Sequence, residues 1–151
     1  MPFKLQSENL YYSYDIKNSH FISLNSEMQF NSQFTPENIL KYTQWLENDL
    51  KTTTKQWKIV YMHRPLYCSS DDGASSGQKV RDLYEELFYK YKVDLVLTGH
   101  THAYERMFPI YKSIIDQNAI KKNLNVYDNP VYPTHLICGT GGNKEDYSYC
   151  N

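Results

Sequence analysis

The sequence predicts an α/β fold in which short buried strands alternate with amphipathic helices. Three observations predict it. Apolar runs rich in β-branched and aromatic residues recur along the chain, helical periodicity occupies the stretches between them, and Pro, Gly or polar residues mark each change of pattern. The 151 residues are 40% hydrophobic and 22% charged, which suits one domain, residues 1–151, with its own core.

The first elements are predicted to be a β-hairpin followed by a helix. Residues 10–16 and 20–25 have the aromatic and β-branched content of strands, and three polar residues join them. A helix is expected from Thr35 to about Leu50. Thr35 is a favourable N-cap, Pro36 suits the first helical position, and apolar residues then recur on one face.

The middle of the chain repeats the strand and helix pattern. Residues 57–62 and 93–97 are short apolar runs that predict buried strands. Residues 68–77 are rich in Ser, Asp and Gly, which predicts a loop, and residues 78–91 have the spacing of a second amphipathic helix. This alternation is typical of an α/β sheet.

The last third is predicted to be less regular. Residues 118–133 are polar and without period, which indicates an excursion over the surface. Residues 134–138 predict a further strand, and residues 139–143 form a Gly-rich turn after it.

Charge and hydropathy argue against two classes of partner. A net charge of -1 without a basic cluster indicates neither a nucleic-acid surface nor a polybasic membrane patch. No apolar run approaches the roughly 20 residues that cross a bilayer, and the first residues lack the apolar core of a signal peptide. Cys68, Cys138 and Cys150 form no CxxC pattern, so the disulfide pairing, the redox compartment and the oligomeric state stay open.

Three histidines follow the ends of two predicted strands. His63 follows the strand at 57–62, and His100 and His102 follow the strand at 93–97 in a Gly-His-Thr-His run. Ligands of open α/β sheets gather beyond the carboxyl ends of the strands, so the three imidazoles converge if the two strands are neighbours. Neutral imidazole is a good ligand for Zn and Fe.

A structural role is the alternative for each histidine. A single HxH run, or a single His after a strand, is usually a hydrogen-bonded polar residue, and three histidines are an incomplete ligand set for two metal ions. His20 and His135 lie inside predicted strands, and we interpret both as structural residues.

The flanks of the three histidines resemble the purple acid phosphatases, a family of dinuclear metallophosphoesterases. Residues 60–63, continuing into RPLY, are similar to the fourth metal-binding block of that family. Residues 99–106, GHTHAYER, are similar to the fifth block, which is the more specific motif. Residues 139–143 resemble the Gly-rich loop that follows these blocks, and residues 9–25 resemble the hairpin that precedes them. The resemblance covers nearly all of the chain.

The resemblance implies a β-sandwich flanked by helices, of which this chain is the C-terminal half with the N-terminal half missing. It implies hydrolysis of small phosphomonoesters at a dinuclear centre of Fe(III) with Zn, Mn or Fe(II). By resemblance, His63 and His100 hold the divalent ion and His102 holds the ferric ion. Secretion or a lysosomal or vacuolar location is implied in the same way.

No residue is assigned to catalysis with certainty, but four are candidates for substrate contact or support of the ligands. Arg64 has a guanidinium group that suits phosphate, although a surface position is an equal alternative. Glu105 is expected to brace the loop by an ion pair with Arg106, and the alternative is that Tyr104 orients one of the histidines. Asn143 is expected to shape a turn whose glycines let the backbone approach the substrate.

The chain departs from the family pattern in its ligands. The blocks that read GDxG, GDxxY and GNH(D/E) in the family, and supply its aspartates, tyrosine and Asn-His pair, have no counterpart here. The loop at 68–77 has no histidine, whereas some relatives place substrate-binding histidines there. Three neutral imidazoles do not balance the charge of two metal ions. We therefore expect this chain alone to bind one divalent ion weakly and to hydrolyse phosphate esters at no useful rate.

Two further readings stay open beside the acid phosphatase. One is a truncated, non-catalytic binding or regulatory domain, and the other is a different metallophosphoesterase such as a phosphodiesterase. The AYER and HRPLY flanks favour the acid phosphatase over the phosphodiesterase. In each case we expect one sheet face to expose apolar residues and unpaired strand edges, which lowers solubility.

Overall fold

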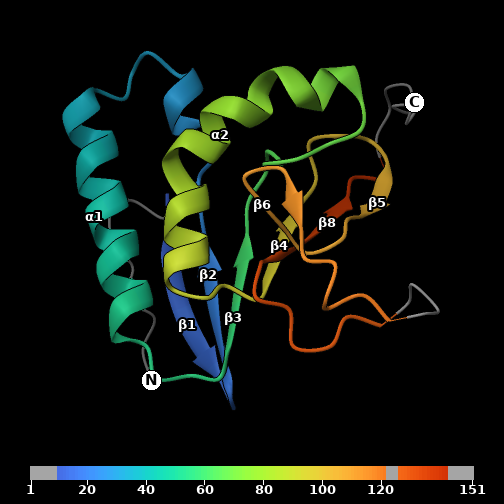
Figure 1. Cartoon of the computed structure of the whole chain (residues 1–151). Helices are drawn as coiled ribbons and strands as arrows, with labels where there is room; N and C mark the ends of the chain where they lie inside the picture. The colour runs from blue at the N-terminus through green and yellow to red at the C-terminus, as the bar shows by residue number, and fades with distance from the viewer. Residues whose placement is uncertain (1–9, 122–125, 143–151) are drawn as a thin grey trace.

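A mixed β-sheet organises the part of the chain that the computed structural model describes, residues 10–121 and 126–142 (Figure 1). The sheet order is β1-β2-β3-β4-β8-β5. Its four inner strands are parallel to one another, and the two edge strands pair antiparallel. The bounds are β1 (Tyr12–Ile16), β2 (Ser19–Ser23), β3 (Trp57–Tyr61), β4 (Leu95–Thr98), β5 (Tyr104–Arg106) and β8 (Thr134–Cys138).

Two helices, α1 (Pro36–Thr52) and α2 (Asp71–Lys90), lie side by side against one face of this sheet (Figure 1). Alternate strand residues point into the interface, because successive side chains of a strand face opposite ways. The expected α/β class, with a sheet flanked by helices, is confirmed. The fully buried core residues include Ile22, Val60 and Val96 from the sheet, Tyr42 and Leu46 from α1, and Val80, Tyr84 and Phe88 from α2.

The predicted hairpin and first helix are both present. β1 and β2 pair antiparallel up to Ile16 opposite Ser19, and Lys17 takes the positive φ of 51° that the tight turn requires. α1 begins with a capping box. The N–H of Asn38 donates to Thr35 Oγ1, and the N–H of Thr35 donates to Asn38 Oδ1. A 3-10 helix, η1 (Met28–Phe30), precedes α1.

The loop expected at residues 68–77 is wrong for most of its length, because α2 begins at Asp71. Ser70 has the extended backbone of an N-cap, with φ −89° and ψ 147°. Gly77 lies inside the helix, where a Cβ would meet the carbonyl oxygen of Leu66 at 2.8 Å. The Ser70 side chain makes no capping hydrogen bond, so of the residues that indicate a loop in the sequence, Gly77 has a clear role, in the close approach of two backbones.

Three short strands escaped the sequence analysis. β5 adds an edge to the sheet directly after the HxH run, and β6 (Ile110–Tyr111) pairs with β7 (Ile114–Ile115) in a small ribbon. Runs of two or three residues are too short to show a period of 2. The surface excursion holds one isolated bridge, between Ile120 and Tyr127, within its described residues.

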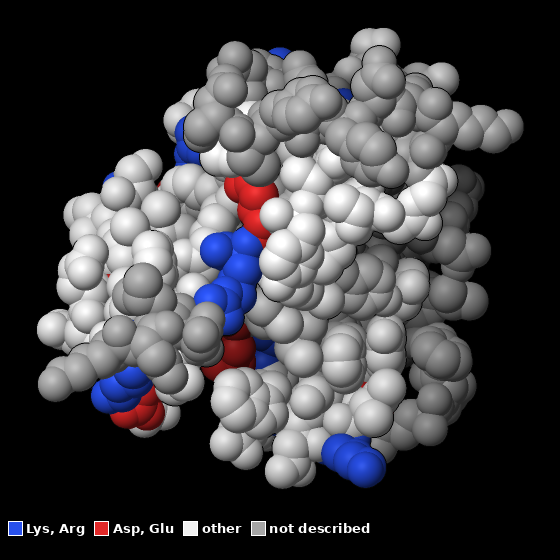
Figure 2. All heavy atoms as spheres, turned by 90° about the vertical axis from the view of Figure 1, so that its right-hand side faces the viewer, with Lys and Arg blue, Asp and Glu red and all other residues white. Residues whose placement is uncertain are grey.

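The sheet face turned away from the helices is apolar and only partly covered. Trp57 and Ile16 are 49% and 53% exposed, and the rings of Tyr14 and Phe21 stack at 5.3 Å between centroids. On the side shown in Figure 2, most charged side chains lie in a narrow central band or at the periphery. The expected apolar face is therefore present. It also contains half-buried residues from four strands: Tyr12, Phe21, Ile59, Tyr61, Leu95 and Leu97.

Candidate metal centre

The carboxyl ends of β3 and β4 bring two of the candidate histidines together. The strands are parallel neighbours, with Tyr61 opposite Leu97. Beyond their ends, the N–H groups of Gly99 and His100 both donate to the carbonyl oxygen of His63, at 3.0 and 2.9 Å. As a result His100 Nδ1 lies 3.0 Å from His63 Nε2, and the ring centroids are 4.8 Å apart.

This separation fits two ligands of one metal ion. Zn–N bonds are about 2.0–2.1 Å long, so two of them at roughly a right angle place their nitrogens about 3 Å apart. Imidazole nitrogens suit Zn or Fe and not the hard ions Mg²⁺ and Ca²⁺. Among the described residues, no three His, Cys, Asp or Glu side chains are arranged to hold an ion. The pair could therefore supply two ligands, and no third joins them among these residues.

His102 lies near the pair but does not complete a three-ligand group with it within the same described residues. Its charge, when present, helps to lower the pKa of His100, so the two rings are close enough to interact. The larger causes of the lowered pKa of His100 are burial, the guanidinium of Arg64 and the His63 ring. A lowered pKa keeps the His100 ring neutral, which is the form that binds metal.

The Gly-rich turn after β8 packs against the backbone of the HxH run. The N–H of Ala103 donates to Thr101 O at 2.8 Å, and the N–H of Gly139 donates to Ala103 O at 3.0 Å. A Cβ at Gly139 would lie 1.7 Å from Thr101 O and 2.7 Å from Gly99 O. Position 139 therefore admits only glycine while the histidine run keeps this path.

Arg64 contacts His100 and is held in place from several sides. Its Nε donates to Glu27 Oε1 at 2.7 Å and its Nη2 to Glu27 Oε2 at 3.0 Å, a bidentate pair. Its backbone N–H donates to Ser26 Oγ, and its guanidinium lies 4.3 Å from the centre of the Phe30 ring. The remaining nitrogen, Nη1, donates to His100 Nε2 at 3.1 Å. Sequence reasoning missed Glu27, since no spacing or motif connects it to a residue 37 positions later.

Glu105 and Tyr104 occupy β5. Glu105 accepts hydrogen bonds from the backbone N–H and the hydroxyl of Ser69, at 3.1 and 2.9 Å, so it braces the segment before α2. Arg106 lies over the ring of Tyr127, 5.2 Å from its centre. Tyr104 is 63% exposed. Asn143 lies outside the described residues.

Cys68 supports the same corner. Its thiol lies 3.2 Å from Thr101 Oγ1 and 3.0 Å from Ser70 Oγ. Thr101 is the fully buried residue between the two histidines of the HxH run, so this contact ties the run to the start of α2. Cys68 and Cys138 are free thiols, and Cys150 lies outside the described residues.

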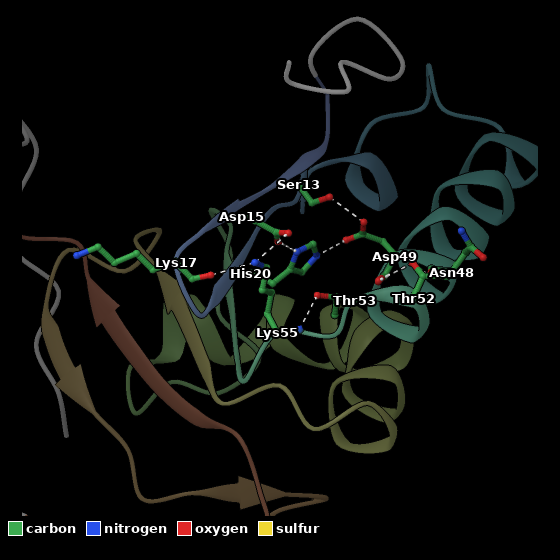
Figure 3. A network of polar contacts seen from close by, with 9 residues as sticks. All are labelled: Ser13, Asp15, Lys17, His20, Asn48, Asp49, Thr52, Thr53 and Lys55. Carbon is green, nitrogen blue, oxygen red and sulfur yellow. Dashed lines mark hydrogen bonds and ion pairs between the residues drawn. The ribbon is translucent and has the colours of Figure 1, made fainter. Parts of the chain in front are cut away.

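A polar network surrounds another histidine, His20, near the amino end of β2 (Figure 3). His20 Nδ1 lies 2.7 Å from Asp15 Oδ1, and Nε2 lies 2.8 Å from Asp49 Oδ2. Ser13 Oγ donates to the other oxygen of Asp49 at 2.7 Å. Burial by itself would lower the pKa of His20, but the hydrogen bonds to Asp49 and Asp15 outweigh burial and raise it. Two carboxylate partners require two N–H donors, so the ring is a cation.

His135 is the second histidine of a strand interior. It is 4% exposed and packs edge-on to the Tyr67 ring, with centroids 5.3 Å apart. Burial lowers the pKa of His135 to about 3, which keeps the ring neutral. Both strand histidines are thus core residues away from the histidine pair.

Comparison with known proteins assigns the fold and the histidine motifs to a family. Residues 4–104 match the calcineurin-like phosphoesterase family. The chain belongs to this family. It is 38% identical to acid phosphatase type 7 of Homo sapiens, over 92% of this chain and 34% of that protein. It is 34% identical to purple acid phosphatase 21 of Arabidopsis thaliana, over 93% of this chain and 29% of that protein.

The chain spans about a third of the length of these curated relatives. Among solved structures it resembles purple acid phosphatase PPD1 from yellow lupin (Lupinus luteus), with a TM-score of 0.73 and 25% identity over 97% of this chain and 25% of that one. GAP50 of Plasmodium has the same fold, with a TM-score of 0.55 and 18% identity over 91% of this chain and 41% of that one. The purple acid phosphatase resemblance is confirmed. In the described part of the chain, no helix is both long and apolar enough to cross a membrane.

Proposed function

We propose that this chain forms part of a purple acid phosphatase that hydrolyses small phosphomonoesters at a dinuclear metal site. One observation supports the proposal most directly. His63 Nε2 and His100 Nδ1 face each other at 3.0 Å beyond the carboxyl ends of two adjacent parallel strands. This is the place in an open α/β sheet where ligands bind.

Each histidine has a role in the proposal. His63 and His100 would hold the divalent ion, Zn, Mn or Fe(II), and His102 would hold Fe(III). When bound, the two ions would neutralise the phosphate oxygens and lower the pKa of the attacking water. Arg64 would offer its guanidinium to a phosphate oxygen, and Gly139 would keep the HxH run in position.

Ligand number limits what the chain does alone. Two imidazoles converge, and the described residues supply no carboxylate beside them that completes a group of three ligands. Metal centres of this charge normally depend on anionic ligands as well as imidazoles. We therefore expect weak binding of one divalent ion and no useful turnover by this chain alone.

The test combines metal analysis with a phosphatase assay. The purified chain would be compared with a fusion that adds the part of a purple acid phosphatase preceding the matched region, using p-nitrophenyl phosphate and bis-p-nitrophenyl phosphate. We expect turnover of the monoester by the fusion and none by the chain alone. Preference for the diester would instead identify a phosphodiesterase.

Matched variants assign the ligands. His63→Ala and His100→Ala should each abolish binding of Zn²⁺ to the chain, whereas His102→Ala should leave Zn²⁺ binding in place and remove iron from the fusion. Unchanged Zn²⁺ binding in both of the first two variants would refute the assignment.

A further inference from the structure

The contact between Arg64 and His100 determines which ring nitrogen of His100 carries hydrogen. A guanidinium only donates hydrogen bonds, so His100 Nε2, 3.1 Å from Arg64 Nη1, must be the accepting nitrogen. The hydrogen of a neutral ring then resides on Nδ1, which donates to His63 Nε2 at 3.0 Å. The three side chains form one directed series, from Arg64 through His100 to His63.

A metal ion between the two histidines needs the opposite arrangement. If His100 and His63 were to hold an ion through the two nitrogens that now face each other, Nδ1 would have to offer its lone pair, and the hydrogen of His100 would then reside on Nε2. Nε2–H and the Arg64 N–H are both donors and repel each other. His63 needs no such change, because its Nε2 already presents a lone pair.

Glu27 keeps Arg64 in this opposing position. It binds Nε and Nη2 at 2.7 and 3.0 Å, so only Nη1 is left to face the histidines. The Phe30 ring and Ser26 hold the same side chain and its backbone. The arginine is only 20% exposed, and its charge therefore acts on the site with limited screening by water.

We propose that Arg64, positioned by Glu27, opposes loading of the divalent ion, and that it must leave His100 when the ion binds. The inference rests on the proposed metal function. Withdrawal of Nη1 frees a cationic donor beside the ion, where an anionic substrate oxygen arrives. Arg64 and Glu27 are positioning residues in this scheme, because they act on the ion through His100 and through charge.

The proposal predicts that substitutions of Arg64 and Glu27 change the Zn²⁺ affinity of the purified chain in opposite directions. Titration calorimetry measures this affinity. Arg64→Met keeps an apolar stem over Phe30 and removes the donor and the charge, so Zn²⁺ should bind about tenfold more tightly. Glu27→Gln keeps the shape but leaves the arginine charge uncompensated, so binding should weaken about tenfold. Glu37→Gln, on α1 and paired with Lys41, is the matched control and should change nothing.

The sign pattern separates this role from a merely structural one. If Arg64 and Glu27 only stabilised the fold, both substitutions would weaken Zn²⁺ binding together. Parallel weakening, or no change in Arg64→Met, overturns the proposal. Absence of Zn²⁺ binding in the parent chain and in Arg64→Met would refute the metal function itself. Binding that depends on His63 but not on Arg64 would refute only this inference.

A second measurement uses the unaltered chain. Nitrogen-15 NMR of its imidazoles should find His100 hydrogen on Nδ1 without metal and on Nε2 after Zn²⁺ is added. Hydrogen on Nε2 in the metal-free chain overturns the proposal whatever the variants do.

Discussion

His20 and His100 are histidines of one sheet in opposite charge environments. His20, near the amino end of β2, lies between two carboxylates, and its pKa is raised despite burial. His100, beyond the carboxyl end of β4, lies beside Arg64 and His63, and its pKa is lowered by burial and by these neighbours. Both nitrogens of the first ring donate to carboxylates, whereas the Arg64 guanidinium, which can only donate, faces a lone pair on the second ring. The neighbours, more than the residue type, decide which ring is held as a cation and which stays neutral.

The largest expected effect is a loss of stability when His20, which lies between two carboxylates, is replaced. His20→Ala leaves two carboxylates without their shared cation, one of them largely buried, which should cost about 2–4 kcal/mol of unfolding free energy. Zn²⁺ affinity should stay unchanged, because the polar network around His20 lies near the amino end of β2. Urea unfolding at pH 6 and calorimetry measure the two effects. A loss below about 1 kcal/mol, or a drop in Zn²⁺ affinity, would break the comparison.

The second-largest effect is expected at Gly139, whose backbone packs against the HxH run. Gly139→Ala introduces a Cβ that would lie 1.7 Å from Thr101 O, so the HxH run must move. We expect a loss of about 1–3 kcal/mol in unfolding free energy together with weaker Zn²⁺ binding. Gly141→Ala is the matched control, because a Cβ there meets nothing within 4 Å. Equal behaviour of the two variants would show that the close approach does not hold the run.

Opposite pKa shifts should give opposite pH dependences. The pKa of His20 is raised on folding, so its contribution to stability is complete below about 6.5 and is lost as pH rises through the folded-state value. The pKa of His135 is lowered to about 3, so folding is penalised as pH falls from about 6.5 toward 3, by up to about 1.4 kcal/mol per pH unit. Urea unfolding between pH 4 and 9 should compare each variant with the parent chain. The stability that His20→Gln loses should be largest at low pH, whereas His135→Leu should remove the penalty that the parent suffers at low pH. The same trend in both variants would contradict the assigned charge states.

The smallest effect concerns the brace on β5. Glu105→Gln weakens the hydrogen bonds to Ser69 and should cost about 1 kcal/mol. Thermal unfolding measures it, with Tyr104→Phe, at a 63% exposed position, as the control that should change stability little. A larger loss of thermal stability in Tyr104→Phe than in Glu105→Gln would mean that β5 is held mainly through its exposed side.

The sequence allowed the five longer strands and the first helix to be predicted, because each has a local signal; of the three histidines expected to converge, His63 and His100 are in direct contact. Thr35 and Pro36 mark a helix start, and residues that follow neighbouring parallel strands meet at the same edge of the sheet. The start of α2 could not be predicted from the Ser and Gly content of its first turns, since a contact with Leu66 explains Gly77. Glu27 carries no local signal at all, because only the folded chain brings it to Arg64.

The spacing of the histidine pair is set by main-chain atoms. One carbonyl group, that of His63, receives the N–H groups of both Gly99 and His100. Every residue except proline has this N–H donor, so these two hydrogen bonds do not depend on the identity of the surrounding side chains. Side chains around the pair can therefore change while the backbone that places His63 beside His100 is kept.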